Sequence, residues 1–291
     1  MQVFIFGKYI KEQDAPYVTE TIEALENNGI SYKMFEPFYK QFALYTKKEC
    51  ATFTGYNDFL REKPNACITL GGDGTILAVM THIRDIETPI LGINLGRLGF
   101  LASIEKTKIN ETIQDLAASK YHTQKRSMIA LTEPDELFPD VSFALNDFTI
   151  NKRDTSSMVT IHTFLDGEFL NSYWADGIIV TTPTGSTGYS LSCGGPIIFP
   201  GSGNFGVVPV APHNLNVRPI VIPDNTELSF KIEGRSESFL CTLDSRHKTI
   251  QANQEIRIKK CDFNTNLLVS KDDSYMNTIR NKLYWGYDKR N

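Results

Sequence analysis

The sequence predicts two domains, an α/β N-terminal domain with a mostly parallel sheet and a β-rich (all-β) C-terminal domain. The 291 residues are more than one domain usually contains. Strand and helix patterns alternate as far as residue 120, and strand patterns then dominate as far as residue 265. We expect the final helix to return to the first domain. The expected domains are therefore 1–120, completed by 266–291, and 121–265.

Short apolar runs in the first domain are separated by segments of helical character. The expected strands are 2–7, 31–36, 66–70 and 89–94, and the expected helices are 15–28, 75–85 and 105–119. Gly29 is placed to end the first of these helices. Alternating strands and helices imply a parallel sheet covered on both faces. In such sheets, ligands bind beyond the carboxyl ends of the strands.

The second domain shows strand patterns and almost no helical periodicity. The expected strands are 126–132, 141–150, 158–165, 168–174, 177–182 and several segments between 204 and 260. Asp166-Gly167 is typical of a tight hairpin turn. Helical character returns only at 274–284, which gives the final helix.

Composition excludes several kinds of partner. The net charge of −4 gives no electrostatic footprint for nucleic acid. No apolar run approaches the roughly 18 residues of a membrane span, and the start lacks the basic region of a signal peptide. The five cysteines contain no C-x-x-C pair, which predicts reduced thiols in the cytoplasm without a disulfide framework or a zinc site.

A glycine-rich turn organises the first domain. An apolar run ends in Gly71-Gly72-Asp73-Gly74-Thr75, and a helical segment follows. A strand, a glycine turn and a helix N-terminus together form a geometry that holds phosphate groups. We expect Gly72 and Gly74 to use positive φ angles and to let a ligand approach the backbone. Asp73 would repel phosphate unless it handles a proton or a metal ion.

The alternative is a simple turn in which Asp73 caps a helix starting at Gly74. The motif is neither a G-x-G-x-x-G fingerprint nor a Walker A loop, since no Gly-Lys-Ser/Thr follows. The segment 94–101 follows the next strand and is expected at the same edge of the sheet. Its apolar residues can enter the core, and Phe100 could stack on a base.

Two groups of polar residues stand out in the second domain. Asn146 and Asp147 lie side by side within an apolar strand, where burial without partners is costly. They could satisfy neighbouring backbone at a bulge, or bind an adenine or amide edge and ribose hydroxyls. Between positions 181 and 192, eight of twelve residues carry hydroxyl groups. Because a strand runs directly into this hydroxyl-rich segment, a polar ligand pocket is favoured over a solvated linker.

These motifs resemble those of the NAD kinases, in order and in separation. The likeness includes the glycine turn, Asn146-Asp147 and the segment 184–192, and it continues through 96–101, 209–213 and 282–285. The glycine turn alone is shared with diacylglycerol-type lipid kinases and, more loosely, with 6-phosphofructokinases. The hydroxyl-rich segment is specific to NAD kinases.

The resemblance implies transfer of the γ-phosphate of ATP to the 2′-hydroxyl of the adenosine ribose of NAD⁺, giving NADP⁺ and ADP. It implies a nucleotide-binding first domain, an NAD-binding second domain and Asp73 as the catalytic proton acceptor. The implied binding residues are Gly71, Gly72, Asp73, Gly74, Thr75, Leu77, Phe100, Asn146, Asp147, Asp176, Thr184, Thr187, Gly188, Tyr189, Ser190, Leu191, Ser192, Ala211 and Arg246.

Three positions depart from the family pattern. Ala is frequent in place of Gly188, a basic residue occurs in place of Trp174, and Gln is frequent in place of Arg246. Position 174 therefore gives no basis for a charge-based choice between NAD and NADP.

Phosphoryl transfer depends mainly on positioning and charge stabilisation. The glycine turn contains no lysine or arginine, so we expect a divalent ion, Mg²⁺, to be held by the phosphates rather than by a set of protein ligands. The expected partners are the substrates NAD and ATP, and further copies of this chain in a dimer or tetramer, without nucleic acid or membrane.

Three rival functions fit less well. A lipid kinase would need a more apolar acceptor pocket, a dinucleotide sensor would not need Asp73, and an oxidoreductase would carry a G-x-G-x-x-G turn.

Overall fold

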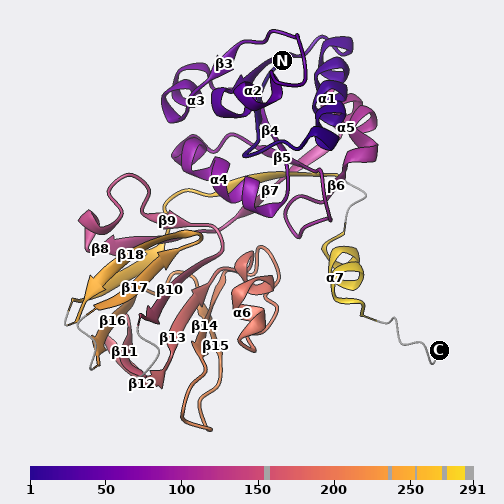
Figure 1. Cartoon of the computed structure of the whole chain (residues 1–291). Coiled ribbons are helices and arrows are strands. Elements are labelled where there is room, and N and C mark those ends of the chain that lie inside the picture. Colours follow the sequence, from indigo (N-terminus) through magenta and orange to yellow (C-terminus); the bar gives the residue numbers. More distant parts are fainter. Residues whose placement is uncertain (154–157, 235–237, 253, 271–273, 286–291) are drawn as a thin grey trace. The chain divides into compact units, whose positions relative to one another are not determined.

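The computed structural model describes residues 1–153, 158–234, 238–252, 254–270 and 274–285 (Figure 1). Its fold divides into two compact units, one formed by 1–125 with 265–291 and the other by 126–264. The helix α7 (Tyr275–Leu283) belongs to the first unit. Within the described part of the chain, no helix is both long and apolar enough to cross a membrane.

The first unit is built on a mostly parallel sheet in the order β3-β2-β1-β4-β5-β20-β7, with β6 beside β5. The strands are β1 (Gln2–Phe6), β2 (Ser31–Phe35), β3 (Thr52–Phe53), β4 (Ala66–Leu70), β5 (Ile90–Asn94), β6 (Ile104–Glu105), β7 (Tyr121–Arg126) and β20 (Thr265–Ser270). The helices are α1 (Ala15–Asn27), α2 (Glu36–Phe42), α3 (Tyr56–Glu62), α4 (Asp73–Ile83), α5 (Ile109–Ala117) and α7. The expected parallel α/β architecture is confirmed.

Alternation along β1 explains why both faces of this sheet are covered. Val3 and Ile5 belong to an apolar cluster with residues of α1 and α5. The intervening Phe4 stacks on Phe53 at 4.3 Å between ring centroids and meets the edge of Phe59 from α3. Successive strand residues point to opposite faces, so each face buries its own apolar set.

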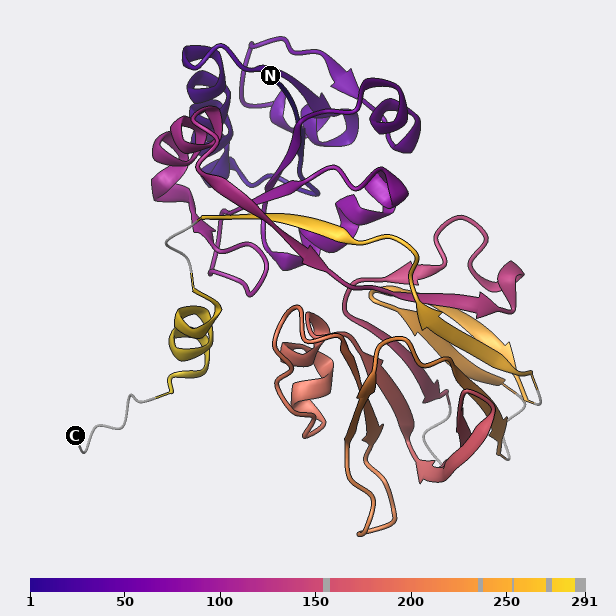
Figure 2. The same ribbon diagram turned by 180° about the vertical axis from the view of Figure 1, so that it is seen from behind.

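The second unit consists of two six-stranded antiparallel sheets, in the orders β15-β14-β13-β10-β17-β18 and β12-β11-β16-β19-β8-β9 (Figure 2). The strands are β8 (Ile129–Glu133), β9 (Phe143–Ala144), β10 (Asp147–Lys152), β11 (Val159–Leu165), β12 (Glu168–Ala175), β13 (Gly177–Thr181), β14 (Asn204–Val210), β15 (Ile220–Pro223), β16 (Leu228–Glu233), β17 (Ser238–Leu243), β18 (Arg246–Gln251) and β19 (Ile256–Lys260). Phe148 of one sheet stacks on Phe230 of the other, in a core that both sheets share.

Several elements differ in detail from the sequence-based expectations. The strand expected at 126–132 begins later, as β8 at Ile129, and β7 (Tyr121–Arg126), which was not expected, pairs beside β20 in the first unit. The strand expected at 141–150 is broken into β9 and β10 at residues 145–146. The helix expected at 105–119 is shorter, because residues 106–108 form a 3-10 turn before α5. The hydroxyl-rich segment contains a short helix, α6 (Tyr189–Ser192).

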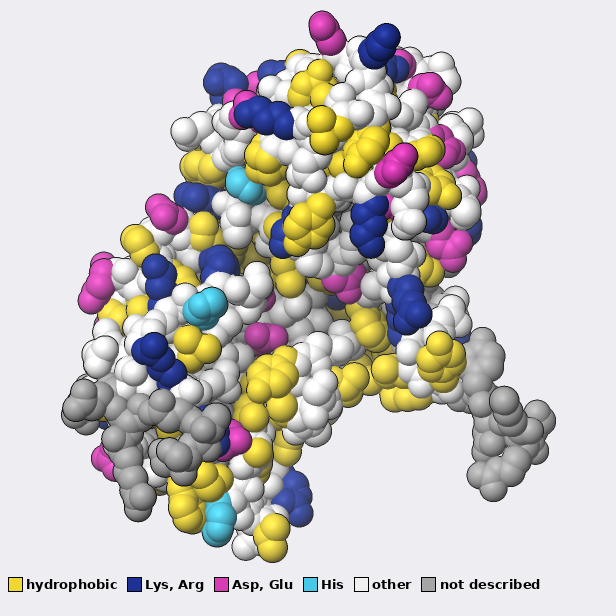
Figure 3. All heavy atoms as spheres, in the orientation of Figure 1, with side chains coloured by type: hydrophobic (Ala, Val, Ile, Leu, Met, Phe, Trp, Pro, Cys, Tyr) yellow, Lys and Arg dark blue, Asp and Glu magenta, His cyan; other side chains and the backbone are white. Residues whose placement is uncertain are grey.

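Charged side chains are mixed on the surface. Figure 3 shows acidic and basic side chains interspersed on the visible face, with hydrophobic side chains between them. All five cysteines are free thiols.

Candidate functional site

The glycine turn joins β4 to α4, and only one of its glycines uses a positive φ angle. Gly71 has φ +148°, whereas Gly72 has φ −81° and precedes the helix, and Gly74 lies within α4. The expectation of positive φ at Gly72 and Gly74 was therefore wrong. A Cβ at Gly71 would lie 2.3 Å from Thr75 Oγ1, whereas a Cβ at Gly74 would meet no atom within 4 Å. The turn thus packs tightly at Gly71 and is open beside Gly74.

Asp73 is the first residue of α4 and does not cap it. Gly72 occupies the capping position, so the alternative of a capping aspartate is wrong. The Asp73 carboxylate accepts hydrogen bonds from the backbone N–H groups of Phe100 (2.8 Å), Leu101 (3.1 Å) and Ala102 (2.9 Å). The segment 100–102 thereby fixes the position of the carboxylate at the N-terminus of the helix.

Gly99 makes this arrangement possible. A Cβ at Gly99 would lie 1.7 Å from Asp73 Oδ1, so no other residue fits without moving the carboxylate. Asn94, at the end of β5, shapes the same loop, because its side chain accepts from Gly96 N (2.8 Å) and donates to Arg97 O (2.8 Å). Phe100 and Leu77 are half-buried in the same unit.

Asn146 and Asp147 lie where β10 begins, and the side chain of Asp244 supports their backbone. Its carboxylate accepts from the N–H groups of Leu145 (2.9 Å), Asn146 (2.8 Å) and Asp147 (3.3 Å). The sequence reasoning did not identify Asp244 as a supporting residue. Asp244-Ser245 are residue types typical of a turn, and they form the short turn between β17 and β18, where Asp244 has φ +51°.

The Asp147 carboxyl is buried beside a second carboxyl. Burial, followed by the charge of Asp244, raises the pKa of Asp147 to about 7. Burial also raises the pKa of Asp244, although its three backbone hydrogen bonds and Arg246 act in the opposite direction. Asn146 Oδ1 is buried and has no hydrogen-bond partner among the described residues. The pair therefore combines a buried amide oxygen that has no partner among the described residues with a carboxyl that titrates near neutral pH.

The hydroxyl-rich segment folds back onto Asn146. Thr182 N donates to Asn146 O (2.9 Å), and Thr182 Oγ1 donates to Leu145 O (2.6 Å). A Cβ at Gly185 would lie 2.1 Å from Asn146 O, so this close approach requires glycine. Many of the hydroxyls are thus used internally. Ser186 Oγ accepts from Ile198 N (2.9 Å) and donates to Pro183 O (2.7 Å).

The second half of this segment approaches two acidic residues. The pKa of Tyr189 is raised chiefly by burial, next by Cys193, and to a smaller degree by the charges of Asp147 and Asp176, which therefore lie near it. The Asp176 carboxylate forms a 2.6 Å ion pair with Lys152 Nζ, at the far end of β10. Lys152 was not among the predicted site residues. Ser190 Oγ is buried and has no partner among the described residues.

The remaining predicted residues differ in exposure. Thr184 is buried, Thr187 and Leu191 are half-buried, and Gly188 and Ser192 are exposed. Ala211 is exposed in the loop after β14 and has φ +45°. The guanidinium of Arg246 donates to the carbonyl oxygens of Val141 and Phe143, so it shapes the chain that leads to Asn146.

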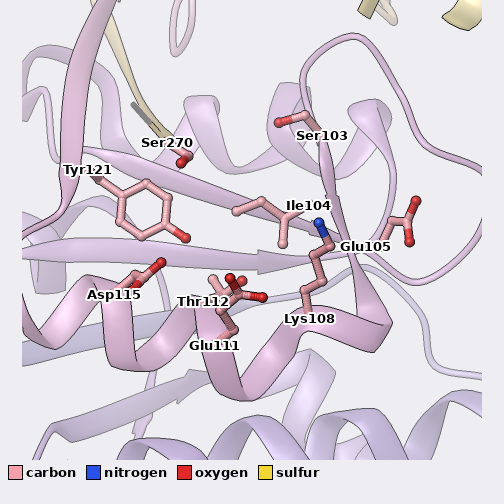
Figure 4. Close-up of a pocket in the computed structure, with 9 residues that line it drawn as sticks. All are labelled: Ser103, Ile104, Glu105, Lys108, Glu111, Thr112, Asp115, Tyr121 and Ser270. Atoms are coloured by element: carbon pink, nitrogen blue, oxygen red, sulfur yellow. The ribbon is translucent and has the colours of Figure 1, made fainter. Parts of the chain in front are cut away.

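The cavities formed by the described residues include two within the first unit. One, of about 250 Å³, lies beside α5, and Figure 4 shows Glu111, Thr112 and Asp115 projecting from that helix toward Tyr121. None of the predicted site residues lines this acidic cavity. The other, of about 520 Å³, is bounded by the Asn94 loop and by α7.

The described side chains do not form a metal site by themselves. Within the described ranges of the chain, no three His, Cys, Asp or Glu side chains are grouped so as to hold a metal ion.

Comparison with known proteins gives a consistent result over the whole chain. Residues 3–121 match the ATP-NAD kinase N-terminal domain, and residues 145–270 match the ATP-NAD kinase C-terminal domain. The chain is 44% identical to an NAD kinase from Cytophaga hutchinsonii over 290 residues, which cover 99% of both chains. It is 42% identical to one from Flavobacterium johnsoniae and 36% identical to one from Bacteroides fragilis, with full coverage of both chains in each case.

Two solved structures share the fold at 23% sequence identity. Yeast NADH kinase complexed with NADH superimposes with a TM-score of 0.87, covering 99% of this chain and 89% of that one. An NAD kinase from Archaeoglobus fulgidus in complex with ATP gives a TM-score of 0.77, covering 98% and 99%.

Proposed function

The chain belongs to the NAD kinase family and acts as an NAD⁺ kinase, and from this premise we propose how its residues share the reaction. The reaction transfers the γ-phosphate of ATP to the 2′-hydroxyl of the adenosine ribose of NAD⁺, which gives NADP⁺ and ADP. In this proposal the first unit binds the phosphates, and the second unit binds the dinucleotide.

The position of Asp73 is the observation that carries the proposal. A ribose hydroxyl is a weak nucleophile at neutral pH, and a carboxylate within hydrogen-bond reach assists as the hydroxyl loses its proton. Three backbone N–H groups fix the Asp73 carboxylate, and the space beside Gly74 is open. The proposal therefore gives Asp73 the role of proton acceptor and gives the residues 71–75 the role of cradling phosphates.

The dinucleotide is assigned to the second unit. The unpartnered Oδ1 of Asn146 is suited to accept from the adenine amino group, and ionised Asp147 is suited to accept from a ribose hydroxyl. Asp176 is assigned to the nicotinamide riboside, and residues 184–192 with Ala211 are assigned to the rest of the pocket. Phe100 and Leu77 are assigned to apolar contact with an adenosine.

A divalent ion, expected to be Mg²⁺, completes the proposal. Mg²⁺ is usually held by one or two carboxylates together with substrate phosphates. The described residues fit an ion that arrives with the phosphates of ATP rather than one held by the chain alone. When bound, such an ion supplies positive charge to the transferred phosphoryl group.

We also place the protein in the cytoplasm as a homodimer or homotetramer. The five free thiols support a reducing compartment. The exposed side chain of Leu215 lines a cavity of the second unit together with the apolar Leu170 and Ile220, which supports a self-association surface there. Light scattering of the purified protein would measure its mass, and a monomeric mass would refute the oligomer.

The test of function is a coupled assay that reads NADP⁺ formation. We expect formation with NAD⁺, ATP and Mg²⁺ together, and no formation when any one of them is omitted. Persistent activity in excess chelator would refute the metal requirement. Tight NAD⁺ binding without NADP⁺ formation would favour a sensor over a kinase.

A further inference from the structure

The larger cavity of the first unit is lined by three cationic side chains. Arg97, Lys106 and Lys282 line it together with a single carboxylate, Glu105. We call this the cation pocket. Lys282 comes from α7 and the other two come from the segment 97–106, so the pocket joins chain segments that are far apart in sequence.

Among the described residues, the three cations have no carboxylate partner. Within the described residues, none of them forms an ion pair, whereas Lys33 and Lys48 each pair with a glutamate at 2.6 Å. Lys106 lies 4.4 Å above the ring of Tyr17. Three cations against one carboxylate, Glu105, leave the lining of the cavity with a net positive charge, which favours an anionic occupant.

The cation pocket adjoins the glycine turn. Gly71 N donates to Ile93 O (2.9 Å), which brings the turn beside the end of β5. A Cβ at Gly72 would lie 3.8 Å from Asn94 Nδ2, and the same nitrogen donates to Arg97 O. A single asparagine side chain thus separates the glycine turn from the loop that carries Arg97.

We infer that the cation pocket receives the phosphate chain of the phosphoryl donor. This inference rests on the proposed function, since it places the donor whose terminal phosphate reaches the glycine turn. Residues 71–75 contain no lysine or arginine, and the cation pocket supplies the positive charge that they lack. The acidic cavity of Figure 4 would repel the same ligand, since Glu105, Glu111 and Asp115 line it with only one lysine, Lys108.

The test compares variants Arg97→Gln and Lys282→Gln with Lys108→Gln, which removes the same charge from the acidic cavity. We expect each of the first two to raise the KM for ATP by about tenfold, the KM for NAD⁺ to stay within about twofold, and Lys108→Gln to change neither. Arg97→Lys should recover part of the loss. Inorganic tripolyphosphate should compete with ATP, and its inhibition constant should rise in the same two variants.

The outcomes separate this inference from the proposed function. If Arg97→Gln and Lys282→Gln both stay active and keep the wild-type KM for ATP, the inference is overturned and the proposed function is not. Failure of the wild-type protein to form NADP⁺ would overturn the proposed function. If only tripolyphosphate inhibition is weakened, the pocket binds inorganic polyphosphate and not the nucleotide, and the inference as stated is also overturned.

Discussion

Asp73 and Asp147 are two carboxyl groups of the candidate site with opposite surroundings. Asp73 accepts three backbone hydrogen bonds. Asp147 accepts none from the described residues and lies near the carboxyl of Asp244, so that its pKa rises to about 7. Backbone donors fix one carboxylate in space, whereas burial and a like charge make the other sensitive to pH. The same side chain can therefore serve as a positioned proton acceptor or as a titratable binding group.

Filling the space beside the Asp73 carboxylate should lower kcat strongly. Gly99→Ala places a Cβ 1.7 Å from Asp73 Oδ1, so the carboxylate must move. We expect kcat to fall about 100-fold, because a displacement near 1 Å in a catalytic group can cost that much. Gly96→Ala, in the same loop, would meet Asn94 Oδ1 only at 3.7 Å and serves as the control. Equal activity of the two variants would show that the position of Asp73 does not matter.

A matched pair of substitutions tests the second unit in the same way. Gly185→Ala would place a Cβ 2.1 Å from Asn146 O, whereas Gly188→Ala would meet Gly185 O at 3.2 Å. We expect the first variant to lose about 1–3 kcal/mol of unfolding free energy and to bind NAD⁺ about tenfold more weakly. Thermal melts and NAD⁺ titrations measure both effects. Because Gly188 is itself assigned to the pocket, it is the control for stability alone, and a comparable loss of unfolding free energy in Gly188→Ala would contradict the close packing proposed for Gly185.

The motifs could be identified in the sequence, but the residues that hold them in position could not. The strand, glycine turn and helix around Asp73 follow from local residue types, and the structure contains all three, with the helix beginning at Asp73 and not at 75. The hydrogen-bond donors to the Asp73 carboxylate are backbone N–H groups of residues 100–102. Almost every residue carries such a group, so the sequence does not single these residues out. The role of Asp244 depends on two strands, β10 and β17, that are adjacent only after the sheet has formed.

Boundaries were less predictable than element types for a similar reason. The segment 121–126 has a strand pattern suited to either unit, and its pairing beside β20 depends on a strand that occurs about 140 residues later. The break at residues 145–146 depends on the Asp244 carboxylate, which takes up the backbone N–H groups there. Long-range contacts decide such details, and local patterns do not contain them.

The pKa of Asp147 predicts a pH dependence of binding. If a ribose hydroxyl donates to the ionised carboxyl, NAD⁺ affinity should decline below pH 7, by up to about tenfold per pH unit. Because the folded-state pKa is raised, the related contribution to stability is present at acid pH and is lost as the pH rises through about 7. Asp147→Asn should abolish both dependences. An unchanged pH profile of NAD⁺ binding in this variant would exclude Asp147 as the titrating group.

The smallest expected effect concerns the ion pair of Asp176. Lys152→Met removes its 2.6 Å partner and should change the KM for NAD⁺ by about two- to fivefold, because partly exposed pairs contribute little. Lys33→Met breaks another 2.6 Å pair, with Glu62 in the first unit, and should leave the KM for NAD⁺ unchanged. Equal effects of the two substitutions would point to general destabilisation.

The most direct test of the central claim is the Asp73→Asn variant, measured for both NAD⁺ binding and the rate of NADP⁺ formation. Asparagine keeps the shape of the side chain but cannot take up the proton of the ribose hydroxyl. We expect the Kd for NAD⁺ to stay within about threefold, and kcat to fall by about 10²–10⁴-fold. An unimpaired kcat would contradict the role of Asp73 as the proton acceptor.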